Sequence, residues 1–210
     1  MSQKTPTLSV IFALCSSVVL LFLICPLLAM VFSVRPVSLW GTIGDTEVLK
    51  ALGLSVLSAS IASGIAVLFG TPFAFLLARR RFPLKGIVDA MVDLPLVVPH
   101  PVAGIALLTL FARRRLIGAF LEGTLGVEIV GALPGIVICM LFVSSSFLIK
   151  GARDAFERVD PRLENAGRSL GASEARVFFT ISLPLALRGI LTGAILSWAR
   201  GISEFGSIMI

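Results

Sequence analysis

Long runs of apolar residues set the strongest constraint on this chain of 210 residues. A run of about 20 apolar residues is typical of a membrane-spanning helix, because a helix satisfies its own backbone hydrogen bonds in lipid. Hydrophobic residues make up 57% of the chain and charged residues only 14%, whereas soluble domains carry about 25% charged residues. The sequence therefore predicts an integral membrane protein.

Five apolar runs follow one another along the chain. They cover about Leu8–Val34, Leu49–Ala78, Ile87–Ala112, Leu133–Ile149 and Val177 to the last residue. We therefore predict an all-α fold, a polytopic transmembrane helical bundle with about five spans in one domain, residues 1–210. The final run ends at Ile210 without a charged flank, so we expect the chain to be truncated at its C-terminus.

The third run contains the stretch DLPLVVPHPVAG, with Pro95, Pro99 and Pro101. Proline lacks an N–H and crowds the preceding turn, so these prolines are expected to break the helix. A break within a bilayer is tolerated only where it faces protein or a water-filled path. His100, between two of the prolines, either satisfies the broken backbone or lies along such a path.

The positive charges predict the orientation of the chain. If the N-terminus is cytoplasmic, most of the Lys and Arg residues between the runs fall on the cytoplasmic side, as is usual in membrane proteins. The outer side then contains Arg113–Arg115, which we interpret as side chains that reach the interface from the end of a span. The net charge of +6 is interpreted as attraction to an anionic membrane surface and not to nucleic acid.

The sequence offers no site for a cofactor or a metal. Cys15, Cys25 and Cys139 lie inside apolar runs, and the chain has a single histidine, so it lacks a set of metal ligands. We interpret the cysteines as small buried hydrophobic residues. The phosphate-binding pattern G-x-x-x-x-G-K-[ST] is missing as well, so we expect no cofactor in this chain.

One polar segment, residues 150–176, interrupts the apolar pattern. Asp160-Pro161 predicts a helix start, with an N-cap acceptor followed by proline in the first turn. Gly171 suits the left-handed residue that ends a helix, and Ser173 can cap the next helix. We therefore predict a short helix from Pro161 to Leu170, an elbow at Gly171 and a helix that re-enters the membrane.

Apolar residues recur through this segment at helical spacing. Phe156, Val159, Leu163, Ala166 and Leu170 follow one another at intervals of three and four and are predicted to share one helix face. Two interpretations fit this pattern: an ordinary loop on the membrane surface, or a docking helix for a cytoplasmic partner.

Acidic residues recur in the same segment at Asp154, Glu157, Asp160 and Glu164, among several arginines. We interpret them as an exposed, salt-bridged helix face and not as paired catalytic carboxylates.

The stretch ENAGRSLGASEARVFFTISLP resembles the EAA signature of ABC-importer permeases, which is Glu-Ala-Ala, three residues, Gly, nine residues, Ile, one residue, Leu-Pro. The signature positions fall on Asn165, Ala166, Gly167, Gly171, Ile181, Leu183 and Pro184. Asn165 replaces the Glu of the signature and Gly167 replaces its second Ala, with Glu164 one position upstream.

Three further stretches are similar to the molybdate/tungstate branch of this family: FGTPFAFLLARRRFP, DLPLVVPHPVAGIALL and SWARGISEFGSIMI. The resemblance runs from the second apolar run to the end of the chain. Sulfate permeases share much of it, so a sulfate importer is the alternative within the family.

The resemblance implies a permease subunit of an ATP-driven oxyanion importer in the cytoplasmic membrane, in a family with a sixth span. Such a subunit works as a pair, with two cytoplasmic ATPase subunits, which bind ATP and Mg, and an extracytoplasmic oxyanion-binding protein. The helix from Pro161 to Leu170 is then the coupling helix that the ATPase moves. The residues expected to couple to the ATPase are Pro161, Leu163, Glu164, Asn165, Ala166, Gly167, Leu170, Gly171, Leu183 and Pro184.

The last run contains two ionisable residues, Arg200 and Glu204, four positions apart and able to share a helix face. Charges inside a membrane are usually functional, but a carboxylate is a poor ligand for an oxyanion. We therefore interpret Glu204 as a structural or gating residue paired with Arg200; the alternative is a solvated residue at the end of its span. The candidate pathway or gate residues are Pro99, His100, Pro101, Arg200 and Glu204.

Two other classes of protein are less consistent with the sequence. A membrane-embedded enzyme needs a convergent polar cluster, which a single histidine does not provide. A channel or secondary carrier shows paired broken helices in two repeated halves, and only one proline-broken segment is evident.

Overall fold

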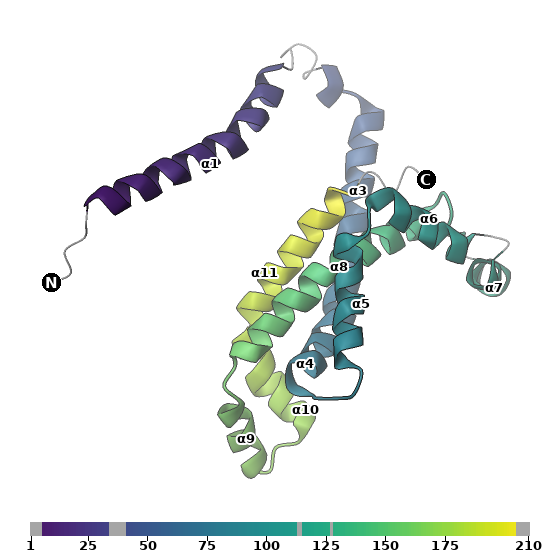
Figure 1. The fold of residues 1–210 in the computed structure, drawn as a ribbon. Helices are drawn as coiled ribbons and strands as arrows, with labels where there is room; N and C mark the ends of the chain where they lie inside the picture. Colours follow the sequence, from purple (N-terminus) through teal and green to yellow (C-terminus); the bar gives the residue numbers. More distant parts are fainter. Residues whose placement is uncertain (1–5, 34–40, 113–114, 127, 205–210) are drawn as a thin grey trace. The chain divides into compact units, whose positions relative to one another are not determined.

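A computed structural model describes residues 6–33, 41–112, 115–126 and 128–204. Within these ranges the chain forms helices and no strand (Figure 1), which confirms the predicted all-α fold. Contacts divide the chain into two units, residues 1–52 and 53–210, and each is described by itself. The single domain, residues 1–210, stays a prediction.

Unit 1 contains helix α1 (Pro6–Ser33) and the start of α3 (Thr46–Ile65). The side chains from residue 8 to residue 33 are all exposed within the unit, as suits a helix surrounded by lipid. Cys15 and Cys25 are therefore exposed, and the prediction that they are buried is wrong.

Unit 2 contains the rest of α3 and all the helices that follow. In chain order these are the π-helical segment η1 (Ala66–Gly70), α4 (Thr71–Arg79), α5 (Lys85–Val97), α6 (His100–Phe111), α7 (Leu116–Leu125), α8 (Leu133–Arg158), α9 (Pro161–Ser169), α10 (Glu174–Val177), the π-helical segment η2 (Phe178–Ser182) and α11 (Leu183–Ile202).

Four described stretches are long and apolar enough to cross a membrane: Leu8–Ser33, Thr46–Arg79, Leu133–Arg158 and Glu174–Ile202. Helices α5 and α6 pass the same test together but meet at a bend of 115°, so they make a fifth span if they are one broken span. The four stretches and the bent pair overlap the five predicted apolar runs; the end of the last run, residues 205–210, lies outside the described residues. Helix α7 has no counterpart among the runs.

The bend between α5 and α6 lies at Pro99. This proline caps α6, and Pro101 stands in the first turn, where no helical hydrogen bond is lost. Val98 has extended backbone, as is usual for a residue before proline. Pro95, by contrast, lies buried inside α5, so the prediction that it breaks the helix is wrong. Proline is tolerated inside a membrane helix where neighbouring groups satisfy the backbone carbonyl that loses its hydrogen bond.

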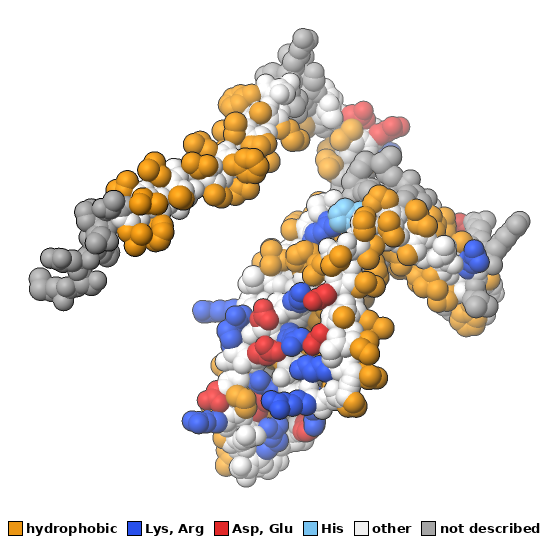
Figure 2. All heavy atoms as spheres, in the orientation of Figure 1, with side chains coloured by type: hydrophobic (Ala, Val, Ile, Leu, Met, Phe, Trp, Pro, Cys, Tyr) orange, Lys and Arg blue, Asp and Glu red, His pale blue; other side chains and the backbone are white. Residues whose placement is uncertain are grey.

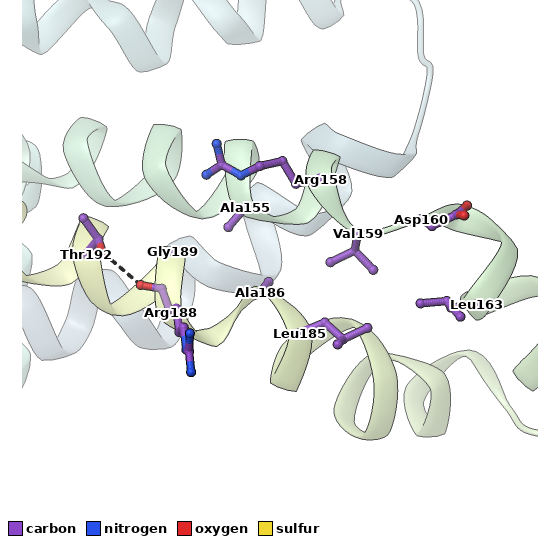
Figure 3. Close-up of a pocket in the computed structure, with 10 residues that line it drawn as sticks. All are labelled: Ala155, Arg158, Val159, Asp160, Leu163, Leu185, Ala186, Arg188, Gly189 and Thr192. Atoms are coloured by element: carbon purple, nitrogen blue, oxygen red, sulfur yellow. Dashed lines mark hydrogen bonds between the residues drawn. The ribbon is translucent and has the colours of Figure 1, made fainter.

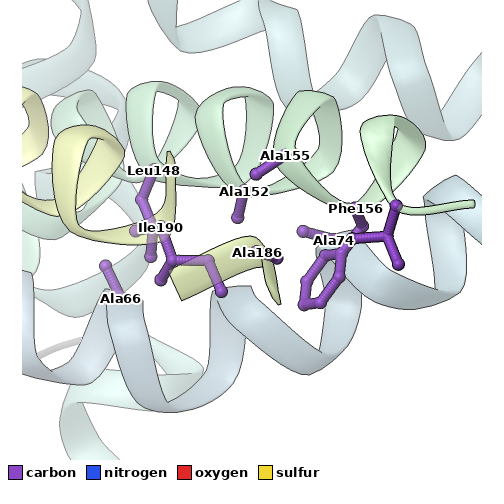
Figure 4. Packing of buried hydrophobic residues seen from close by; sticks show 9 residues of the cluster. Ala66, Ala74, Leu148, Ala152, Ala155, Phe156, Ala186 and Ile190 are labelled. Carbon is purple, nitrogen blue, oxygen red and sulfur yellow. The ribbon is translucent and has the colours of Figure 1, made fainter. Parts of the chain in front are cut away.

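Helices α8 and α11 pack closely against each other. A Cβ added to Gly193 would lie 3.2 Å from the Leu148 carbonyl oxygen, and one added to Gly151 would lie 3.0 Å from the Gly193 Cα. Small residues let backbones approach in a membrane, where packing and not the hydrophobic effect holds helices together. The core around this contact, drawn in Figure 4, consists of Ala66, Ala74, Leu148, Ala152, Ala155, Phe156, Val159, Ala186 and Ile190.

Two ion pairs join α5 to α8. Lys150 Nζ lies 2.7 Å from Asp93 Oδ1, and Arg153 Nη1 lies 2.8 Å from Asp89 Oδ1. These ion pairs fix α5, the first helix of the bent pair, along the charged end of α8.

Candidate functional site

Helix α9 begins at the predicted residues. The Asp160 carboxylate accepts a hydrogen bond from the Arg162 N–H at 2.9 Å, and Pro161 follows in the first turn. Both features satisfy or remove backbone donors that have no partner inside the helix.

The elbow after α9 is a Schellman motif. Gly171 has φ +86°, its N–H donates to the Arg168 carbonyl at 2.9 Å, and the Ala172 N–H donates to the Gly167 carbonyl at 3.1 Å. Ser173 then caps α10, because its hydroxyl oxygen accepts a backbone N–H at 3.3 Å. The predicted helix, elbow and second cap are confirmed.

A buried carboxylate joins α9 to two other elements. Glu164 is only 2% exposed. Its Oε1 accepts hydrogen bonds from Arg79 Nε at 3.0 Å and from Ser182 Oγ at 2.9 Å. Arg79 Nη2 also donates to the Val159 carbonyl at 2.7 Å. One carboxylate therefore holds together the end of α4, helix α9 and the end of η2.

The predicted exposed acidic face is wrong for Glu164. Asp154, Glu157 and Asp160 are exposed, and Glu157 forms an ion pair at 2.8 Å within α8. The chain changes direction between α8 and α9, however, so Glu164 does not continue the face of the residues before it.

The predicted five-residue apolar face is likewise divided between two helices. Phe156 lies in the last turn of α8, Val159 follows it, and both are buried. On α9, Leu163 is 48% and Leu170 is 89% exposed, and Ala166 is exposed as well. Helix α9 therefore presents apolar side chains on its exposed surface.

The remaining signature residues have structural contacts. Gly167 packs against Ile181 and Val177: a Cβ added to it would lie 2.8 Å from Ile181 Cδ1 and 3.2 Å from Val177 Cγ2. On the surface of α9, Asn165 Oδ1 accepts a hydrogen bond from Arg168 Nη2 at 2.6 Å. Leu183 packs against the core, and Pro184 stands in the first turn of α11.

Charged side chains gather around α9. Figure 2 shows most of the Lys, Arg, Asp and Glu side chains on this face of unit 2 over the half that contains α4, α9 and α10. One exposed pair there joins Arg80 Nη2 to Glu174 Oε1 at 2.9 Å.

A second charged cluster joins the start of α6 to the end of α11. Arg200 Nη1 lies 3.0 Å from Glu204 Oε2, and His100 Nδ1 lies 3.5 Å from Glu204 Oε1. Arg200 Nη2 lies 2.8 Å from His100 Nε2. Glu204 is 1% exposed, so its predicted pairing with Arg200 is confirmed and the solvated alternative is excluded.

The sequence left two roles open for His100, and the partners that the structure describes are not the broken backbone of the first role. Its ring contacts Arg200 and Glu204, while Pro99 and Pro101 hold it at the bend. Arg200 Nη2 also lies 3.1 Å from His100 Nδ1, so the guanidinium faces both ring nitrogens.

Sequence reasoning did not identify Arg79 as a site residue. It is one of three consecutive arginines at the end of an apolar run, and its partner Glu164 is 85 positions away. Only the displacement of Glu164 from the signature position gave a hint of a separate role.

In the part of the chain that the structure describes, no group of three His, Cys, Asp or Glu side chains is placed to hold a metal ion. Cys139 is half-buried in α8.

The family model described as "binding-protein-dependent transport system inner membrane component" matches residues 70–209. The chain belongs to this family.

Three curated proteins illustrate the similarity. The molybdate/tungstate transport system permease protein WtpB of Pyrococcus abyssi is 46% identical over 169 residues, which cover 80% of this chain and 62% of WtpB. The molybdenum transport system permease protein ModB of Escherichia coli K12 is 42% identical over 158 residues, 75% of this chain and 69% of ModB. The probable sulfate transport system permease protein cysT of Chlorokybus atmophyticus is 33% identical over 171 residues, 81% of this chain and 59% of cysT. The chain thus spans 62% of the length of WtpB.

We expect Glu164→Gln to lower the free energy of unfolding by about 3 kcal/mol, because the largely buried Arg79 guanidinium loses its carboxylate. Denaturant unfolding of the purified chain in detergent measures the change. The control, Glu174→Gln, removes the exposed partner of Arg80 and should cost less than about 1 kcal/mol. Equal losses in the two variants would contradict a structural role for Glu164.

Gly171→Val should lower the free energy of unfolding by about 1–2 kcal/mol, because a β-branched residue resists positive φ. Gly171→Asn should cost less, since Asn tolerates the left-handed region. Gly86→Val is the control, because an added Cβ there meets no heavy atom within 4 Å and the backbone is not left-handed. Unfolding midpoints give the ranking, and a larger loss for Asn than for Val would exclude the left-handed elbow.

Proposed function

We propose that the chain is the permease subunit of an ATP-driven importer of molybdate or tungstate in the cytoplasmic membrane. The observation that carries the proposal is α9, an exposed helix between two candidate spans that is held by the buried Glu164 and contains the first three positions of the EAA-like signature. WtpB and ModB, which are named as molybdate/tungstate and molybdenum permeases, support the substrate. The similarity to cysT supports a sulfate importer as the alternative, at the lower identity of 33%.

The proposed importer contains two copies of this chain, two cytoplasmic ATPase subunits and an extracytoplasmic oxyanion-binding protein. ATP and Mg²⁺ bind to the ATPase subunits, since this chain lacks the phosphate-loop pattern. In this proposal the N-terminus lies in the cytoplasm and the bent pair α5–α6 crosses the membrane as one span, so that α9 lies on the cytoplasmic side.

Coupling passes through the Glu164 cluster. The ATPase contacts Leu163, Ala166 and Leu170 on the exposed surface of α9, and closure of the ATPase dimer displaces this helix. Because Glu164 is bound to Arg79 at the end of α4 and to Ser182 at the end of η2, the displacement reaches the second and the last span together.

The His100–Arg200–Glu204 cluster acts as the gate. It joins the bend at Pro99 to the end of α11, so its separation releases the bent pair from the last span. Glu204 does not bind the oxyanion in this proposal, because like charges repel, and substrate choice comes from the binding protein.

ATP hydrolysis in liposomes tests the proposal. The liposomes contain the chain, its candidate ATPase and its candidate binding protein, and tungstate, molybdate or sulfate is added in turn. Tungstate or molybdate is expected to stimulate hydrolysis severalfold, and sulfate is not. Stimulation by sulfate alone would replace the substrate and keep the importer, whereas failure to bind any ATPase would contradict the importer itself.

Leu170→Asp should weaken binding of the ATPase by about tenfold or more, because it puts a charge at the centre of an apolar contact. Leu170 is 89% exposed, so the unfolding temperature should not change. Ala175→Asp, at an exposed position of α10, is the control and should retain affinity. An unchanged affinity for Leu170→Asp, measured by surface binding of the ATPase, would exclude α9 as its docking helix.

A further inference from the structure

A groove of about 620 Å³ lies between the end of α8, the start of α9 and the start of α11 (Figure 3). Ala155, Val159 and Ala186 are buried and form part of its apolar lining. Figure 3 shows Arg158 on α8 and Arg188 on α11 at opposite rims, each with its guanidinium extended away from the centre. The groove therefore combines an apolar floor with two flexible cationic side chains.

The position of this groove relative to the membrane follows from the length of α8. A hydrocarbon core of about 30 Å is filled by about 20 helical residues, so α8, which begins at Leu133, leaves the hydrocarbon before Ala155. Gly189 packs against Ala155, where an added Cβ would lie 2.5 Å from the Ala155 Cβ, so Arg188 is at the same depth. Both arginines thus lie at the level of lipid phosphate groups.

The other basic residues of α8 nearby form ion pairs, whereas the two arginines of the groove form none with the described residues. Lys150 and Arg153 on α8 are paired with Asp93 and Asp89. Neither groove arginine forms an ion pair with another residue that the structure describes. The lining has one carboxylate, Asp160, and one of its oxygens is engaged in capping α9.

We propose that this groove binds the headgroup of an anionic phospholipid. The phosphate lies between Arg158 and Arg188, whose rotatable side chains fold over it, and the first part of an acyl chain lies against Ala155, Val159 and Ala186. Basic pockets between membrane helices are suited to such headgroups, because attraction to the phosphate adds to the apolar contact of the chain. The proposal depends on insertion in a membrane and not on the transported substrate.

Native mass spectrometry of the full chain in detergent tests the proposal. The chain is incubated with equal amounts of dioleoyl-phosphatidylglycerol and dioleoyl-phosphatidylcholine, and the bound lipid is identified. We expect a clear preference for phosphatidylglycerol, which falls by about fivefold for each arginine removed in Arg158→Gln, Arg188→Gln and the double variant. Equal retention of the two lipids by the unmodified chain would overturn the proposal whether or not the variants fold.

The matched control is Arg162→Gln/Arg176→Gln, which removes two exposed arginines that do not line the groove. It should retain the preference for phosphatidylglycerol. An equal loss in this control would show attraction to surface charge in general and would overturn the groove as the site. Displacement of the lipid by millimolar inorganic phosphate or molybdate would identify a site for free oxyanions. A lipid-free dimer would show that a second copy of the chain covers the groove. Either result would overturn the proposal.

Discussion

The ion pair between Glu164 and Arg79 is the interaction on which the position of α9 depends. Glu164 is the one buried residue of this helix, so apolar packing contributes little to its placement. A buried carboxylate requires a cation and hydrogen-bond donors in a defined geometry, and Arg79 and Ser182 supply them. This directional contact holds α9 in one orientation while its apolar side chains remain exposed.

Helix α11 connects the two charged clusters. Ser182 directly precedes it, and Arg200 lies about 27 Å farther along the helix axis. Between them, Gly193 brings the backbones of α8 and α11 into contact, so the two helices are held as one packed body. In the proposed mechanism this body carries a displacement of α9 to the cluster at His100.

Charge along α8 is graded by depth. The helix begins with apolar residues, continues with Lys150 and Arg153, which are paired with acidic residues of α5, and ends at Arg158 on the rim of the groove. Ion pairing suits the level where water is scarce, because an unpaired charge there is costly. Beyond the hydrocarbon an arginine needs no protein partner, which leaves Arg158 available to a lipid phosphate.

Local sequence determined the helical runs, the cap at Asp160 and the elbow at Gly171, because these features depend on residues only a few positions apart. The displaced Glu164 and the pair formed by Arg200 and Glu204 were visible for the same reason. Tertiary structure alone decided that Glu164 is buried, since Arg79 is 85 positions away, and that His100 faces Arg200, which is 100 positions away. The structure also places Pro95, a residue type that favours a break, buried inside α5. Partners distant in sequence meet only after the spans have packed, and no short-range pattern encodes that packing.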